Sequence, residues 1–177
     1  MIMTNIETTH SKIFTLKNFK LEHLIYFTVL TTAAVFASLF HNQFITGPIV
    51  NATLILCTAL IGIRYGVMIS LIPSIIAFST GLLPVVLMPM IPFIMLSNII
   101  LVTIFNYFKK NNFWEGLIVG STAKTVFLFL TSTLIMQTFA PSKTIADQIV
   151  IMMSWPQFIT ALAGGVLAFG ILKALKK

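Results

Sequence analysis

The sequence predicts an all-α membrane protein in which six transmembrane helices form one compact bundle. Of its 177 residues, 58% are hydrophobic and only 8% are charged, and the mean hydropathy is +1.01. A soluble domain carries about 25% charged residues, so these side chains are too few to cover a soluble surface. The composition excludes a soluble enzyme, a nucleic-acid-binding protein and a disordered protein. It also excludes most β-barrels, whose strands alternate apolar and polar residues.

Apolar runs separated by short polar turns give the number of helices. A spanning helix needs about 20 apolar residues. After a polar leader at residues 1–23, which we expect to be cytoplasmic, residues 24–177 therefore form one six-helix domain with short loops. The predicted helices cover about residues 24–40, 49–63, 66–83, 85–108, 113–139 and 149–175.

Prolines and glycines mark the helix ends. Pro48 suits the first turn of the second helix, because proline lacks an N–H that this turn does not need. A single helix over residues 49–83 would be about 52 Å long, which exceeds a hydrocarbon core of about 30 Å. Gly62, Arg64 and Gly66 therefore predict a tight hairpin between the second and third helices.

The basic residues predict that both termini are cytoplasmic and that the protein lies in the cell membrane. With six spans, the termini and the loops after the second and fourth helices share one side. Cytoplasmic segments are enriched in Lys and Arg, and the loops on the opposite side contain Lys143 alone. Nine of the eleven basic residues fall on the side of the termini, namely Lys12, Lys17, Lys20, Arg64, Lys109, Lys110, Lys173, Lys176 and Lys177.

A cleavable signal peptide is the alternative for residues 1–37. The lysines would form its basic region, and Val35-Phe36-Ala37 would form its cleavage site. Five spans would then remain, with a weaker charge bias.

Catalytic and cofactor motifs are missing. The three histidines lack metal-ligand spacing, the sequence has a single cysteine, and the four carboxylates lie in loops or at the ends of predicted spans. The segment from Gly120 to Thr125 fails the phosphate-binding loop pattern at Ile118 and Ala123. We therefore expect no enzyme activity, no cofactor and no metal, and any energy for transport must come from partner ATPases.

Lys124 is the most informative residue, because it lies about midway along the fifth predicted span. Placing a charge there costs about 3 kcal/mol on insertion scales. Two explanations remain open. Lys124 either faces a polar cavity and contacts an anionic or carbonyl group of a ligand, or it is a structural lysine bonded to backbone carbonyls or to Asn98.

Polar side chains in the other predicted spans favour a substrate-binding pocket. An amide in hydrocarbon needs hydrogen-bond partners, and Pro156 frees a backbone carbonyl one turn earlier. Isolated amides can instead join helices without forming a pocket. The candidate substrate-binding residues are Lys124, Asn98, Asn51, Asn42, Gln43, His41, Trp155 and Gln157.

Small residues at four-residue spacing indicate two close helix contacts. Ala33 and Ala37, with Ala34 beside them, form a flat patch on the first predicted helix. The patch is either a partner interface or internal packing. Gly116 and Gly120 form a GxxxG pair that favours close packing of the fifth helix.

Together these features resemble the S components of energy-coupling factor (ECF) vitamin transporters over residues 24–175. That family has an AxxxA motif in its first helix, matched here by Ala33 and Ala37. The resemblance implies docking through this face onto a transmembrane T component, with two cytoplasmic ATPases as further partners. It also implies that the loop at residues 40–48 covers a small water-soluble vitamin or related micronutrient. The protein would capture this substrate outside the cell and deliver it across the bilayer.

Two other functions remain possible from the sequence. One is a multispan scaffold of a cell-envelope complex, which would use the same packing motifs without a pocket. The other is a stand-alone small transporter. Such transporters often contain internal repeats, and we find no convincing repeat between residues 24–83 and 113–175.

Overall fold

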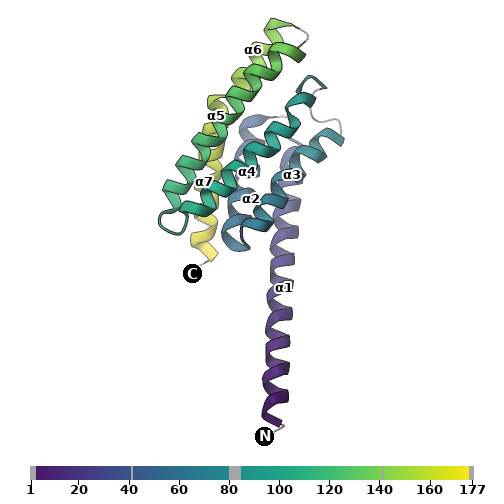
Figure 1. The fold of residues 1–177 in the computed structure, drawn as a ribbon, viewed down its shortest axis with the longest axis vertical. Coiled ribbons are helices and arrows are strands. Elements are labelled where there is room, and N and C mark those ends of the chain that lie inside the picture. Colours follow the sequence, from purple (N-terminus) through teal and green to yellow (C-terminus); the bar gives the residue numbers. More distant parts are fainter. Residues whose placement is uncertain (1–2, 41, 80–84, 141, 176–177) are drawn as a thin grey trace.

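The computed structural model describes residues 3–40, 42–79, 85–140 and 142–175, and these residues form helices and short turns without a β-strand (Figure 1). The helices are α1 (Met3–Ser38), α2 (Gln43–Leu60), α3 (Ile63–Ser79), the 3-10 helix η1 (Val85–Met90), α4 (Ile91–Phe108), α5 (Phe113–Phe139), α6 (Lys143–Met152) and α7 (Trp155–Leu175). The predicted all-α bundle is confirmed.

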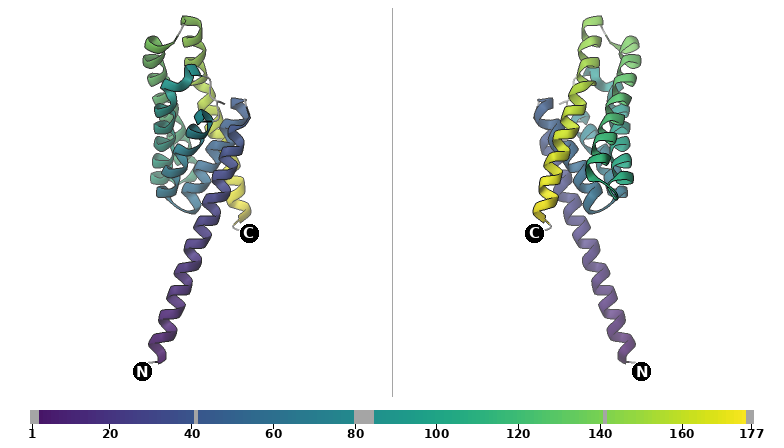
Figure 2. Two further views of the ribbon diagram at one scale, coloured as in Figure 1. Left: turned by 90° about the vertical axis from the view of Figure 1, so that its right-hand side faces the viewer. Right: turned by 90° about the vertical axis from the view of Figure 1, so that its left-hand side faces the viewer.

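Helix α1 is longer than the first predicted span. It begins at Met3 and continues through the described part of the polar leader. This leader contains neither proline nor glycine, so no residue in it ends the helix. The first half of α1 extends away from the bundle in Figure 2, and only its second half packs against other helices. In the same views the N- and C-terminal ends lie beyond the same end of the bundle.

Helix α2 begins six residues before its predicted start. Asn42 caps the helix: its side-chain oxygen accepts a hydrogen bond from the Phe44 backbone N–H at 2.9 Å, which satisfies one of the free donors of the first turn. Pro48 consequently lies inside α2 rather than in its first turn. The predicted loop at residues 40–48 is thus mostly helical.

The hairpin between α2 and α3 is where the sequence predicts it. Helix α2 ends at Leu60 and α3 begins at Ile63. Gly62 has a φ of 105°, which is a conformation that glycine adopts without steric strain.

Prolines also shape the segment before α4. The predicted fourth helix starts at Val85, but residues Val85–Met90 form a 3-10 helix and the α-helix begins at Ile91. Pro89 lies inside the 3-10 helix and removes a backbone N–H there, whereas Pro92 lies in the first turn of α4, where the missing N–H is not needed. The end of the third predicted helix and its connection to the fourth fall on residues 80–84, which lie outside the described residues.

The predicted sixth helix is two helices. Ser142 caps α6 by accepting a hydrogen bond from the Ile145 N–H, so α6 begins within the predicted loop at residues 140–148. The chain then breaks after Met152 and restarts as α7 at Trp155. Pro156 explains the break, because proline cannot donate the hydrogen bond that would continue α6.

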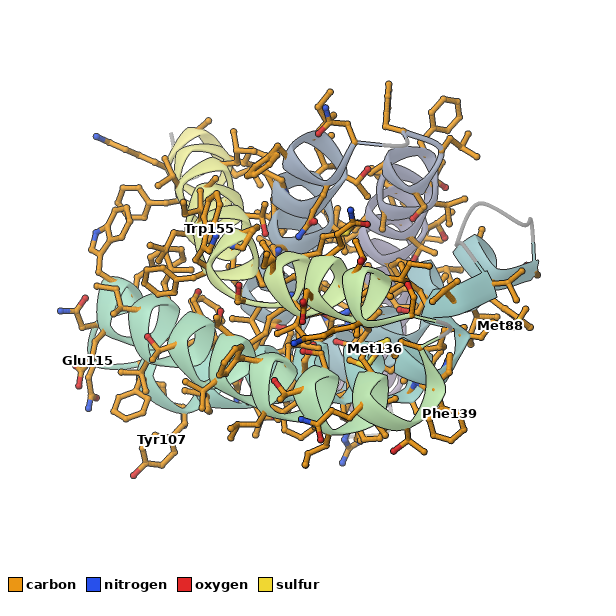
Figure 3. All side chains as sticks on the ribbon, turned by 90° about the horizontal axis from the view of Figure 1, so that it is seen from above. Met88, Tyr107, Glu115, Met136, Phe139 and Trp155 are labelled. Carbon is orange, nitrogen blue, oxygen red and sulfur yellow. The ribbon has the colours of Figure 1, made fainter. Side chains whose placement is uncertain are left out.

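Five helical segments are long and apolar enough to cross a membrane: Leu21–Ser38, Gln43–Leu60, Val85–Phe108, Phe113–Phe139 and Lys143–Leu175. The shorter apolar stretch Ile63–Ile76 in α3 is a sixth. Six spanning segments therefore fit the structure. Viewed along the bundle in Figure 3, Tyr107 and Phe139 point outward. Both side chains are exposed, as expected where lipid surrounds an apolar surface.

Helix α2 is the central helix of the bundle. Eight consecutive residues, from Asn51 to Thr58, are buried, so α2 has neighbours on every side at this level. Its closest approach is to α7. A Cβ on Gly164 would lie 2.7 Å from the Pro48 carbonyl oxygen and 2.8 Å from the Ala52 backbone nitrogen.

The predicted GxxxG contact joins α5 to α4. A Cβ added to Gly116 or Gly120 would lie 3.1 Å from a backbone carbonyl oxygen of α4, that of Phe105 or Leu101 respectively. Small residues permit this close approach of two helix backbones. The close packing predicted for these glycines is confirmed.

We predict that Gly164→Ala destabilises the protein by about 1–3 kcal/mol, because its methyl group would meet backbone atoms that cannot move independently. The matched control is Gly170→Ala on the same helix, where a Cβ meets no atom within 4 Å. This control should be neutral or slightly stabilising. Thermal unfolding of the purified variants in one detergent checks both. Equal melting temperatures for the two variants would contradict the tight contact between α2 and α7.

Candidate substrate-binding site

Lys124 is held by two asparagines from two other helices. Its side chain is 3% exposed. The ammonium nitrogen Nζ donates to Asn51 Oδ1 of α2 at 2.7 Å and to Asn98 Oδ1 of α4 at 2.8 Å. These bonds join three helices that are far apart in sequence, at the middle of α5.

The two asparagine side chains are themselves fixed in orientation. Asn51 Nδ2 donates to the Gly47 carbonyl oxygen at 2.9 Å, and Asn98 Nδ2 donates to the Ser70 carbonyl oxygen of α3 at 3.4 Å. Each amide group therefore gives one of its two N–H donors to a backbone carbonyl and directs its oxygen to Lys124. Helix α3 is included in the network through this second bond.

The close helix contacts explain how Lys124 reaches both partners. Lys124 lies one turn beyond Gly120 on the same face of α5, where α5 approaches the backbone of α4. Asn98 lies about one turn from Leu101, whose carbonyl faces Gly120. The glycine contact thus sets the distance between the helices that the lysine and the asparagine bridge.

A cavity of about 340 Å³ opens beside this network. Its size lies at the lower end of the range for small-molecule sites. Residues from α1 through α7, with η1, line it: Ser38, Phe40, Gln43, Thr46, Gly47, Val50, Asn51, Pro73, Ser74, Leu87, Ile91, Ile94, Asn98, Lys124, Met152, Met153 and Gln157. Its lining includes the end of α1 and the start of α2, and these two helix ends lie away from the chain termini in Figure 1.

The break between α6 and α7 supplies a backbone acceptor at the cavity wall. Gln43 Nε2 donates to the Met152 carbonyl oxygen at 2.9 Å, and Gln157 Nε2 lies 3.4 Å from the same oxygen. Met152 precedes Pro156 by four residues, so this is the carbonyl that the proline frees. The expectation that Pro156 exposes a carbonyl near the site is confirmed, and the start of α2 is tied to the break by a side chain.

The structure brings together five of the eight predicted substrate-binding residues. Lys124, Asn98, Asn51, Gln43 and Gln157 all line the cavity.

The other three predicted residues lie elsewhere. Asn42 caps α2 and does not line the cavity. Trp155 is 57% exposed and packs against Phe44, with ring centroids 6.2 Å apart. His41 lies outside the described residues.

Sequence reasoning missed the hydroxyl and methionine part of the wall. Ser38, Thr46 and Ser74 contribute hydroxyl groups, and Met152 and Met153 contribute thioethers. Serine, threonine and methionine are ordinary residues of membrane helices, so their types alone give no signal. The one available signal was position: Met152 and Met153 come four and three residues before Pro156.

The alanine patch of α1 faces the interior. Ala34 and Ala37 are 0% and 2% exposed, whereas Ala33 is partly buried. The two buried alanines pack inside the bundle, so they are not available to a partner in this structure. The partner interface stays a prediction, and Ala33 is the member of the patch that keeps contact with the surface.

Taken together, the apolar exterior, the six spanning segments and a buried lysine beside a ligand-sized cavity define a multi-span membrane protein with a cavity inside its bundle. The comparison with protein families agrees. Residues 16–175 match the family described as "ECF transporter, substrate-specific component". The chain therefore belongs to this family, which confirms the resemblance to S components. No curated protein and no solved structure matches the chain.

We predict that the bonds between Lys124 and Asn98 couple the two residues energetically. Asn98→Leu removes one acceptor of a buried ammonium and should cost about 1–3 kcal/mol. Combining it with Lys124→Met removes the charge that needs the acceptor. The loss of unfolding free energy in the double variant should therefore be smaller than the sum of the losses in the two single variants. We expect the difference, which is the coupling energy, to be about 0.5–3 kcal/mol.

The control for this cycle is Asn106→Leu, which makes the same change about two turns further along α4. Combined with Lys124→Met it should be additive to within about 0.5 kcal/mol. Chemical unfolding of the six proteins in one detergent gives both values. Additive losses for Asn98 and Lys124 would show that their contact does not stabilise the bundle.

Proposed function

We propose that this protein is the substrate-binding subunit of an ECF-type importer, and that it captures a small water-soluble vitamin or related micronutrient in the cavity beside Lys124. The observation that carries the proposal is a buried ammonium at the wall of a cavity of about 340 Å³ in a member of the substrate-specific component family. A structural scaffold would have no need for such a cavity.

The orientation of the protein follows from its charges. Arg64, Lys109, Lys110 and Lys173 lie at the end of the bundle near the termini, whereas Lys143 lies at the opposite end. The excess of basic residues favours the cytoplasm for the first end. The cavity then opens toward the outside of the cytoplasmic membrane, where a substrate would be captured.

The partners follow from the family. A substrate-specific component without a phosphate-binding loop needs other subunits to use ATP. We assign this role to two cytoplasmic ATPases joined to the protein by a transmembrane T component. The proposed docking surface is the outer face of α1 around Ala33, with Val29, Thr32 and Phe36, which are exposed to the surroundings of the bundle.

We predict that Lys124→Ala weakens substrate binding by at least tenfold, because the ammonium is a charged group at the cavity wall. Native mass spectrometry of the protein purified from its membrane should show a small molecule bound to the wild type. The Lys124→Ala variant should lose it. Lys143→Ala, which removes an exposed lysine of α6, is the control and should retain it. If the Lys124→Ala variant retained the small molecule as well as the wild type does, Lys124 would have a structural role and no role in substrate binding.

We predict that Ala33→Trp prevents docking on the T component and abolishes uptake while sparing ligand binding, because the indole would project from the proposed docking face. Copurification of the T component with the tagged protein measures docking. Val166→Trp is the matched control, since Val166 is exposed on α7 and lies on another helix. Normal copurification and wild-type uptake with Ala33→Trp would remove α1 from the docking surface.

A further inference from the structure

The described lining of the cavity has a basic side chain and no acidic one. Lys124 is its cationic lining residue, and no carboxylate is present among the described residues that line it. Glu22, Glu115 and Asp147 are exposed, and none of them lines the cavity. In a low-dielectric interior a charge without a counter-charge is costly.

The asparagines do not remove this charge. Their oxygens are neutral acceptors, and each amide gives one of its two N–H donors to a backbone carbonyl, that of Gly47 or Ser70. A lysine ammonium has three N–H donors, and two are given to Asn51 and Asn98. The third has no acceptor among the described residues, so it is available to a molecule in the cavity.

The other lining side chains indicate which chemical groups the rest of the ligand would carry. Apolar side chains form about half of the wall, and Phe40 provides the one aromatic ring among the described lining residues. A wall of this kind suits an aliphatic body better than a large planar ring, which is usually held between aromatic side chains. Gln43 and Gln157 give the wall amide groups near the Met152 carbonyl, at the break between α6 and α7.

We propose that the substrate is a small organic acid with one carboxylate, which lies against Lys124, and a mainly aliphatic body with a polar group that meets Gln43 or Gln157. This inference rests on the proposed function and names the substrate class of that site. A charge-assisted bond from the ammonium to a carboxylate is stronger than one to a neutral oxygen. The ligand would therefore supply the counter-charge that the protein lacks.

Charge and size exclude other classes. A phosphate monoester carries a charge of about −1.5 to −2, and one ammonium among the described lining residues leaves part of that charge uncompensated. A cationic ligand would be repelled by Lys124. A cavity of about 340 Å³ also holds a small molecule rather than a large one.

The test compares acids with their neutral counterparts on the wild-type protein in detergent. Pantothenate with panthenol, biotin with biotinamide, and lipoate with lipoamide form three pairs that differ at the carboxylate. Thiamine serves as the cationic probe, pyridoxal 5′-phosphate as the phosphate ester, and riboflavin as the planar ring. Thermal shift identifies the probes that bind, and isothermal titration gives their dissociation constants.

We expect one of the carboxylates to bind at least ten times more tightly than its neutral partner. Lys124→Gln should remove that preference, and Lys143→Gln should keep it. The comparison within each pair uses the wild type alone, so it stands even where the Lys124 variant fails to fold.

Each other outcome contradicts a defined part of the proposal. Equal binding of both members of a pair, or binding of thiamine, pyridoxal 5′-phosphate or riboflavin in place of the acids, overturns the substrate class and leaves the binding function intact. Absence of binding by all probes also overturns the class as stated. If native mass spectrometry then shows no retained molecule either, the proposed function fails with it.

Discussion

The hydrogen bonds of Lys124 are the constraint on which the bundle depends. An ammonium in the middle of a membrane-spanning bundle must find acceptors inside the protein, since neither lipid nor bulk water is there to supply them. Asn51 and Asn98 provide the acceptors, and their own amide donors extend the network to Gly47 and to α3. Helices α2, α3, α4 and α5 must therefore sit in one relative arrangement for every group to be satisfied.

The tight glycine contacts make that arrangement possible. Gly120 brings α5 against α4 at the level of Lys124, and Gly164 brings α7 against the part of α2 that carries Asn51. The association of helices in lipid has little hydrophobic driving force and relies on close packing and on polar bonds. Here both kinds of contact occur at the same level of the bundle, beside the cavity, so the packing also fixes the geometry of the site.

Much of this could be predicted from the sequence, because a charge or an amide in an apolar run needs a partner. That argument identified Lys124, Asn98 and Asn51. The position of Pro156 likewise predicted a backbone carbonyl without a helical partner, which is that of Met152. The boundaries were less predictable. The cap by Asn42 and the break after Met152 depend on local hydrogen bonds that composition does not reveal. The orientation of Ala34 and Ala37 depends on which face of α1 meets the bundle, and spacing alone leaves that choice open.

The unequal lengths of α3 and α5 affect the surrounding bilayer. At 1.5 Å per residue, the 17 residues of α3 extend about 26 Å and the 27 residues of α5 about 40 Å. A hydrocarbon core is about 30 Å thick, and a mismatch costs a fraction of a kcal/mol per Å. The bilayer beside the short helix α3 is therefore expected to become thinner, whereas the long helix α5 fits the bilayer by tilting. Helix α1 packs against α3, so a neighbouring protein that covered this thin side would relieve the deformation. The bilayer itself would then favour association at the face of the bundle that carries α1.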